Sequence, residues 1–153
     1  MNRRCFIFGA MSLPILPRTV LAQSPKLMVF KLQTCGCCDA WVTHMQEAGF
    51  TSETENLSER VLLNLKKRVG LTQKFFSCHT AFVNKYIVEG HVPSRDVLLL
   101  LMQKPNALGL TVPGMPVGSP GMRMGNHRDP FDTLLLLRDG NSEVFQSHRG
   151  IST

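Results

Sequence analysis

The chain has 153 residues, a length typical of a single domain, and 43% of them are hydrophobic, which is sufficient for a core. Its formal net charge is +6, but three of the basic residues lie before residue 23, where no acidic residue occurs. The remainder has 14 basic against 11 acidic residues, a balance of +3 that excludes the basic footprint of a nucleic-acid-binding protein. The sequence also contains no internal repeat, no phosphate-binding glycine loop and no Ser-His-Asp motif.

The first 22 residues are predicted to be an export signal peptide, and residues 23–153 a single mature domain. Two arginines are followed by a short apolar stretch with two prolines, and Val20 and Ala22 suit cleavage before Gln23. The stretch is too short for a membrane span, which disfavours an uncleaved anchor. RRCFI also resembles a twin-arginine signal, so the export route stays open. We therefore expect a periplasmic protein with no membrane span after signal removal.

The mature chain begins with strand and helix signals in alternation. KLMVFKL, residues 26–32, is a short apolar run that predicts a buried strand. Residues 39–48 have helical spacing with their apolar side chains on one side, and Gly49 takes the C-cap position. Residues 50–57 alternate weakly and predict a second strand.

Ser58 is predicted to cap a second helix, which Gly70 closes. The predicted apolar stripe of this helix consists of Val61, Leu62, Leu65 and Val69. Lys66 and its two basic neighbours are predicted to form a solvated last turn, because cations suit the C-terminal end of the helix dipole.

Two short β-rich runs, residues 80–83 and 86–89, predict a hairpin that turns at Asn84-Lys85. A third helix is predicted from Ser94 until Pro105 stops it. Its inward residues are predicted to be Val97, Leu98, Leu101 and Met102.

The order strand, helix, strand, helix, hairpin, helix predicts an α/β protein with a thioredoxin-like fold, a βαβαββα core. A Met-, Gly- and Pro-rich loop, residues 109–130, follows this core and is long enough to suggest a function. Residues 134–145 then predict a terminal β-hairpin turning at Asp139-Gly140.

Three cysteines, Cys35, Cys37 and Cys38, lie between the first strand and the first helix. Cys35 and Cys38 have the CxxC spacing of a redox pair, and a helix N-terminus favours the thiolate form. A third thiolate on so tight a turn would be repelled unless a soft cation, copper(I) or zinc, lay among the sulfurs. The pattern therefore favours a metal site.

Cys78 and His79 precede the third strand, a position that faces the CxxC turn in a thioredoxin-like fold. A fourth thiol and an imidazole would thus approach the first three cysteines. The alternative is two disulfides among the four mature cysteines, with His79 on the surface. His91 could be a ligand or a structural residue, whereas His148 is expected to belong to the tail.

Further candidate ligands lie in the long loop, namely Met115, Met122, Met124 and His127. Thioethers suit copper(I), although methionines also serve as adaptable packing beneath loops. His44 lies about 10 Å along its helix from the cysteines, from the 1.5 Å rise per residue, and is predicted to be structural.

The blocks TCGCCDAWVTHMQEAGF, SCHTAFVNKYIVEGHVP and VPGMPVGSPGM, followed by DPFDTLLL, resemble the CopG-type family of bacterial copper-resistance proteins. The resemblance covers about residues 26–148. It implies an exported thioredoxin-like protein that binds copper at its CxCC motif, with a cluster and copper redox chemistry as implied features. By position, the motif is Cys35, Cys37 and Cys38, and the later block is Cys78-His79.

The sequence therefore predicts a periplasmic copper-binding protein that protects against excess copper, with other periplasmic copper-handling proteins as its partners. Binding of copper(I) is the expected role, and redox turnover of copper is a possible enzymatic addition. One alternative is a thiol–disulfide oxidoreductase that uses Cys35 and Cys38. The other is a structural zinc site in a partner-binding module.

Overall fold

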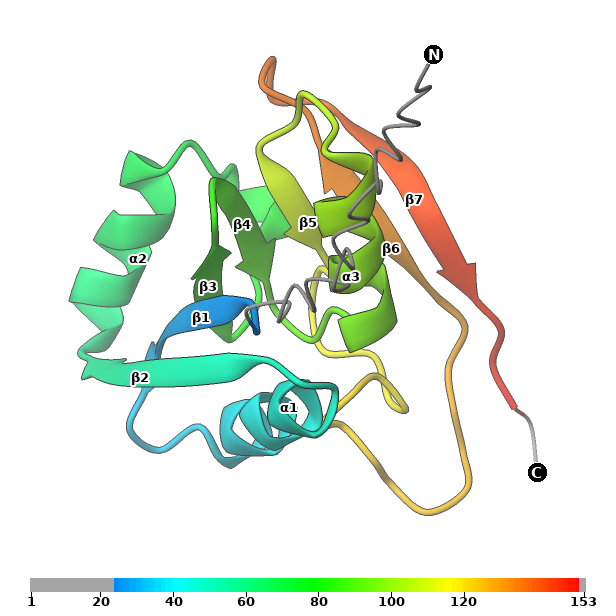
Figure 1. Cartoon of the computed structure of the whole chain (residues 1–153). Coiled ribbons are helices and arrows are strands. Elements are labelled where there is room, and N and C mark those ends of the chain that lie inside the picture. Colours follow the sequence, from blue (N-terminus) through cyan, green and yellow to red (C-terminus); the bar gives the residue numbers. More distant parts are fainter. Residues whose placement is uncertain (1–23, 152–153) are drawn as a thin grey trace, which may run out of the picture.

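The computed structural model describes residues 24–151, so the predicted signal peptide lies outside the described residues. This part of the chain is a mixed α/β protein (Figure 1). The strands are β1 (Lys26–Leu32), β2 (Thr51–Leu57), β3 (His79–Val83), β4 (Tyr86–Glu89), β5 (Gly109–Thr111), β6 (Phe131–Leu136) and β7 (Ser142–His148). The helices are α1 (Gly36–Glu47), α2 (Glu59–Arg68) and α3 (Ser94–Gln103), with a short 3-10 helix at Gln73–Phe75.

One sheet contains all of these strands, in the order β2-β1-β3-β4-β5-β6-β7. Two neighbouring pairs are parallel, β1 with β2 and β4 with β5, and the other pairs are antiparallel. The α/β class and the predicted order of elements from β1 to α3 are confirmed. None of the helices between residues 24 and 151 is long and apolar enough to cross a membrane.

The structure differs from the sequence-based expectation at several element boundaries, and the terminal hairpin is longer than predicted, from Phe131 to His148. Helix α1 begins at Gly36, before the predicted start, so its first turn includes two of the cysteines. Ser94 is the first residue of α3, and Pro93 takes the cap position. The predicted loop from residue 109 opens with β5, a strand of three residues that joins the terminal hairpin to the sheet. Gly109 weakens the sequence signal for this strand, because glycine is uncommon inside strands. The structure nevertheless requires glycine there, since a Cβ would collide with the Ile87 backbone of β4.

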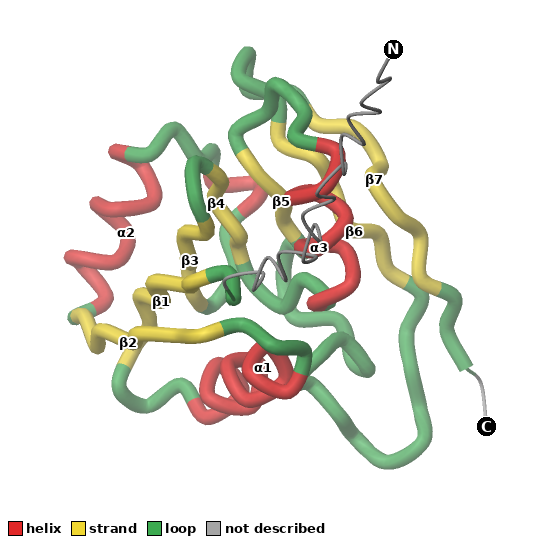
Figure 2. Tube along the Cα trace, viewed as in Figure 1, coloured by secondary structure: helices red, strands yellow, loops and turns green. Residues whose placement is uncertain are grey.

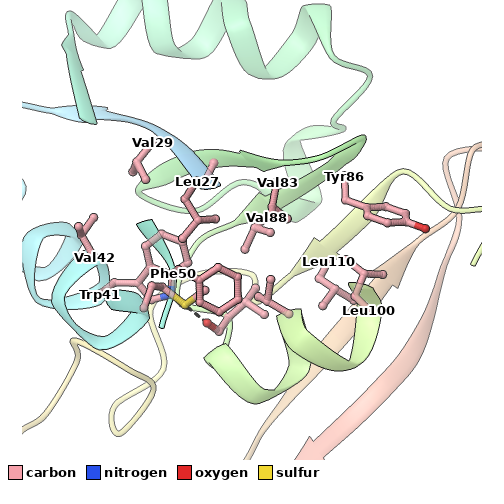
Figure 3. Close-up of a cluster of buried hydrophobic side chains, with 14 of the residues drawn as sticks. Leu27, Val29, Trp41, Val42, Phe50, Val83, Tyr86, Val88, Leu100 and Leu110 are labelled. Carbon is pink, nitrogen blue, oxygen red and sulfur yellow. Dashed lines mark hydrogen bonds between the residues drawn. The ribbon is translucent and has the colours of Figure 1, made fainter. Parts of the chain in front are cut away.

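The helices cover both faces of the sheet (Figure 2). Side chains of α1 and α3 pack with alternate residues of the central strands in the main core, where Trp41 is fully buried (Figure 3). Successive strand residues point to opposite faces, so Val88 joins that core while Ile87 packs on the other side with Leu71 and Phe75. Helix α2 lies on this second face, where Lys66 reaches β3 and β4.

Two helix faces differ from the predicted ones. In α2, Lys66 is 2% exposed and Val61 is 45% exposed, so the predicted solvated lysine is buried and one predicted core residue is not. Lys66 can be buried because its ammonium forms an ion pair with Glu89. In α3, Leu98 and Met102 are exposed and the buried leucine is Leu100. A run of four leucines does not specify which side of a helix faces inward.

Candidate metal centre

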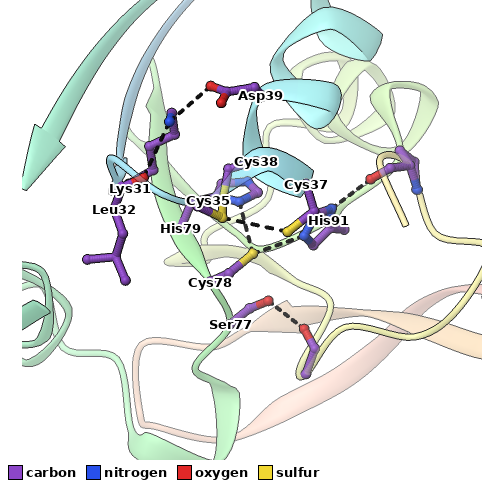
Figure 4. The surroundings of a disulfide bond; sticks show 12 residues. Lys31, Leu32, Cys35, Cys37, Cys38, Asp39, Ser77, Cys78, His79 and His91 are labelled. Atoms are coloured by element: carbon purple, nitrogen blue, oxygen red, sulfur yellow. Dashed lines mark hydrogen bonds and ion pairs between the residues drawn. A yellow bond between two sulfur atoms is a disulfide. The ribbon is translucent and has the colours of Figure 1, made fainter. Parts of the chain in front are cut away.

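The CxCC cysteines lie where β1 passes into α1. Cys35 takes the N-cap position, and Cys37 and Cys38 lie in the first turn of the helix. Cys35 and Cys38 form a disulfide with a Cα–Cα distance of 5.4 Å, because residues three apart on a helical turn lie close together (Figure 4). Cys38 is fully buried, and the free thiol of Cys37 is partly exposed. The described chain therefore contains one disulfide, not the two that pairing of all four cysteines would give.

Strand pairing brings Cys78 to the same place. Strand β3 runs antiparallel to β1 with His79 opposite Lys31, so the residue before β3 lies beside the end of β1. That residue is Cys78, and β1 leads directly into the CxCC turn. All four sulfur atoms consequently lie within 4.8 Å of one another. The structure brings the four cysteine sulfurs together, two of them joined in the disulfide, whereas their role as metal ligands stays a prediction.

Two imidazoles adjoin the Cys78 thiol and form a second candidate group with it. The Sγ of Cys78 lies 2.9 Å from Nε2 of His91 and 3.4 Å from Nδ1 of His79. The Nδ1 of His91 is 2.7 Å from the carbonyl oxygen of Pro120, which can only accept, so His91 carries its proton on Nδ1. The lone pair of His91 Nε2 therefore faces the sulfur, and Cys78 donates its proton to it.

Burial sets the protonation of this group. Burial, followed by the neighbouring Cys37, raises the pKa of the Cys78 thiol to about 12. Burial lowers the pKa of His91, and it lowers the pKa of His79 well below the ordinary value, with the neighbouring His91 ring as the next cause. Both rings are therefore neutral at pH 7, the form in which imidazole binds a metal.

His79 supplies a test of whether these residues fit a metal. Its ring is fully buried against the Trp41 indole, with ring centroids 4.3 Å apart. Among the buried side-chain nitrogen and oxygen atoms of residues 24–151, only His79 Nε2 has no hydrogen-bond partner. Such an atom is costly unless something else satisfies it, and the other ring nitrogen, Nδ1, is the one that lies beside the Cys78 sulfur. Four soft sulfur donors beside two neutral imidazoles are a donor set that suits copper or zinc.

The long loop covers one side of the centre. Gly121 has a φ of +86°, and a Cβ there would meet the carbonyl oxygen of Cys37 at 2.6 Å and the amide nitrogen of Trp41 at 2.9 Å. Only glycine fits so close an approach in this conformation. The loop therefore lies directly against the N-terminal half of α1, and the Pro120 carbonyl binds it to His91 on the other side of the centre.

The loop residues predicted as ligands differ in position. Met122 is half-buried and follows Gly121, whereas Met115 and Met124 are 51% and 66% exposed. His127 belongs to neither candidate group, and its Nε2 lies 2.9 Å from Asp129. Metal binding by these four residues stays a prediction.

The other histidines have structural contacts. His44 Nε2 accepts the Ser94 backbone N–H at the start of α3, as its predicted structural role requires. His148 is not a tail residue, because its Nε2 lies 2.8 Å from Asp96 and its ring stacks on Phe131. This network ties β7 to α3. His91, in contrast, lies at the centre. The sequence did not decide between a ligand role and a structural role for it.

Replacing His44 with glutamine is expected to make folding less sensitive to acid. Burial lowers the pKa of His44 below 6.5, Glu47 opposes this and Arg123 adds to it. As the pH falls through 6.5, the unfolded chain therefore binds more protons than the native one, and the free energy of unfolding decreases. A glutamine oxygen can accept the same Ser94 N–H without titrating. Urea unfolding from about pH 7.5 to about pH 5 checks this, and equal pH slopes for His44→Gln and wild type would refute it.

Comparison with known proteins identifies the family. The family model described as "Protein of unknown function, DUF411" matches residues 75–122, which include Cys78, both imidazoles and Gly121. The solved structure "Copper resistance protein copG- Form 2" is 35% identical with a TM-score of 0.77, over 83% of this chain and 100% of that chain. "Copper resistance protein copG- Form 1" is 35% identical with a TM-score of 0.76, over 82% and 98%. A search of curated proteins finds no match. The resemblance read from the sequence is confirmed, and the chain belongs to the CopG family of copper resistance proteins.

Proposed function

We propose that this protein binds copper(I) between the CxCC turn and Cys78, and that it does so in the periplasm as part of copper resistance. The observation that carries the proposal is the meeting of four sulfur atoms within 4.8 Å of one another at a helix N-terminus. Thiolate sulfur is the donor that copper(I) prefers. The names of the two related structures point to copper rather than another soft metal.

Copper(I) is the cargo in this proposal, and the centre must be reduced to receive it. A dithiol reductant would supply the two electrons and two protons that convert the Cys35–Cys38 disulfide into two thiols, and would itself be oxidised to a disulfide. The protein then offers four thiols, each of which gives up a proton when the metal binds. The free N–H groups of the first turn of α1 favour the thiolates of the CxCC.

Three further residues support the centre. His79 and His91 offer neutral imidazole nitrogens, either as additional ligands or as partners that orient the Cys78 sulfur. Lys31 is 4% exposed, and its ammonium lies 3.0 Å from Asp39 in the first turn of α1. This ion pair holds the end of β1 against the first turn of α1, which carries Cys37 and Cys38.

Exchange of the bound metal between copper(I) and copper(II) is the finer part of the proposal. Its support is the mixed donor set, since thiolates favour copper(I) and imidazoles are also good ligands for copper(II). Anaerobic reduction and reoxidation of the copper-loaded protein, followed by its electron paramagnetic resonance signal, tests this part separately.

The main test measures the metal that the protein acquires in cells. The full chain is expressed with its own signal while copper and zinc are both available, and is purified without oxygen. We expect copper in the product, removable by a copper(I) chelator, with little zinc. Zinc bound tightly at one ion per chain would instead support the structural zinc site, and a metal-free protein would refute both metal proposals.

A thiol–disulfide oxidoreductase is the second candidate, and the Cys35–Cys38 disulfide at a helix N-terminus favours it. Cys38 is fully buried, so a substrate thiolate would attack the partly exposed Cys35. Reduction of insulin disulfides by the metal-free protein, with dithiothreitol as the source of electrons, tests this candidate, because the thiolate of reduced Cys35 would then attack the insulin disulfide. Turnover comparable to that of a dedicated oxidoreductase would favour it over copper binding.

Replacing Met115, Met122 and Met124 together with leucine is expected to weaken copper(I) binding and to spare zinc binding. Leucine keeps the bulk and the apolar character, so packing changes little, while the thioethers that favour copper(I) are lost. Competition with a chromogenic copper(I) chelator measures the affinity. Met102→Leu, at an exposed position on α3, is the matched control. Unchanged copper(I) affinity in the triple variant would assign the three methionines to packing or to the surface.

Export is proposed to remove the first 22 residues, all of which lie outside the described structure. The intact mass of protein from the periplasmic fraction is expected to correspond to a chain that starts at Gln23 or within one or two residues of it. A full-length mass recovered from the membrane fraction would support the uncleaved anchor instead.

A further inference from the structure

A buried ion pair lies behind the metal centre, on the face of the sheet that α2 covers. The Lys66 ammonium and the Glu89 carboxylate are 2.5 Å apart, and their side chains are 2% and 0% exposed. Removing two charges from water is costly, and well-packed apolar residues often stabilise a core just as effectively as a buried ion pair. Stability alone therefore does not account for this pair.

The carboxylate of Glu89 uses both oxygens. Its Oε1 accepts from the Lys66 ammonium and, at 2.7 Å, from the backbone N–H of Ser77. Its Oε2 accepts from the Thr80 hydroxyl at 2.7 Å, and Lys66 also donates to that hydroxyl at 2.8 Å. Burial raises the pKa of Glu89, while Lys66 and the donors Thr80 and Ser77 oppose the rise. One of the three donors to this carboxylate thus belongs to the residue directly before Cys78.

Ser77 lies in the segment that links the 3-10 helix to β3, outside any helix or strand. Its hydroxyl donates to the Gly114 carbonyl oxygen at 2.5 Å, so the long loop holds Ser77 from a second direction. Gly90 has a φ of +73° and lies so close to the Ser77 side chain that a Cβ would collide with it. The backbone before Cys78 is therefore fixed mainly by contacts with Glu89, Gly114 and Gly90.

We propose that Glu89 is a positioning residue of the metal centre: held in place by Lys66, its carboxylate fixes the Ser77 N–H and so sets the Cys78 sulfur beside His91 and Cys37. The metal half of this inference rests on the proposed copper(I) binding. The positioning of the thiol can be measured without metal.

Two double variants isolate the hydrogen bond from the charge. Lys66→Met with Glu89→Gln removes both charges but keeps a side-chain oxygen for the Ser77 N–H. Lys66→Met with Glu89→Leu removes both charges and that acceptor, at nearly the same volume. Thr80→Val is the matched control, because it removes a different hydrogen bond of the same carboxylate. Circular dichroism and thermal melts establish that each variant is folded.

The first readout is the rate at which iodoacetamide alkylates Cys78 in the metal-free protein, followed by peptide mapping. The second is copper(I) affinity after reduction, from competition with a chromogenic chelator. We expect the Gln double variant and Thr80→Val to stay within about twofold of wild type. The Leu double variant should be alkylated about tenfold faster and bind copper(I) about tenfold more weakly, the usual size of such an orienting effect.

Equal alkylation rates in the two double variants would overturn the inference and leave the ion pair with a purely structural role. If the Leu double variant does not fold, Glu89→Asp replaces it, since aspartate keeps the charge for Lys66 but draws the carboxylate away from Ser77. This variant should change Cys78 alkylation in the same direction, and wild-type rates in it would also overturn the inference. Wild-type protein that binds no copper(I) would refute the proposed function, while the alkylation comparison would still decide the role of Glu89.

Discussion

Replacing Cys78 with serine is expected to lower copper(I) affinity at least about tenfold, because it removes the sulfur by which β3 contributes to the centre. Serine is nearly isosteric, and its hydroxyl can still donate to Nε2 of His91, so the fold and the neighbouring imidazoles should be kept. The CxxC pair remains. Chelator competition and copper per chain on reduced protein measure the effect.

Insulin reduction by metal-free Cys78→Ser is the control, and it should match wild type because Cys35 and Cys38 are intact. Cys37→Ser provides a comparison within the CxCC, since Cys37 is the other free thiol of the described chain. Wild-type affinity and stoichiometry in Cys78→Ser would show that the CxCC acts alone. Copper binding to unreduced wild-type protein as strong as to reduced protein would show that the Cys35 and Cys38 sulfurs are not needed.

The strand and helix that flank the CxCC could be predicted from the sequence, because local patterns of residues specify them. The apolar run before Cys35 predicts β1, and the helical spacing after Cys38 predicts α1, so the CxCC had to lie at a strand-to-helix junction. The alternation of elements then predicted that the start of β3 approaches this junction. The pairing of β3 with β1 is the contact that brings Cys78 there.

His91 could also have been placed from the sequence. The hairpin turns at Asn84-Lys85, and its register pairs Thr80 with Glu89. Continuing that register outward by two residues sets Cys78 opposite His91, and the two side chains do meet at 2.9 Å. The predicted two-residue turn therefore already implies that Cys78 lies opposite His91.

The ion pair beneath the centre could not have been predicted in this way. Lys66 and Glu89 are 23 residues apart, on a helix and a strand whose packing depends on the whole sheet. A lysine in the last turn of a helix is ordinarily solvated, and only the opposing carboxylate makes its burial tolerable. The course of the long loop is equally non-local, since single contacts such as that of Gly121 with α1 determine it.

Breaking the Lys66–Glu89 pair from one side is expected to destabilise the protein by about 3 kcal/mol or more, because the remaining ion is left buried without its partner. Lys66→Met and Glu89→Gln should therefore each lower the free energy of unfolding. The double variant should recover much of the loss, since no unpaired charge remains. A loss in the double variant equal to the sum of the two single losses would contradict this coupling.

The two single variants should also differ in how their loss of stability depends on pH. In the wild type, burial raises the pKa of Glu89 and the Lys66 ammonium opposes this rise. In Lys66→Met the cation is gone, so the native pKa of Glu89 lies further above the unfolded value than in the wild type. The native state can then take up a proton and relieve the cost, and the loss of stability should shrink as the pH falls toward 5, a window set by this raised pKa. In Glu89→Gln, no buried carboxyl remains to take up a proton, so the loss should not shrink as the pH falls. Urea unfolding at about pH 5, 7 and 9 separates the two cases, and parallel profiles would mean that the variants act through packing rather than through the unpaired charge.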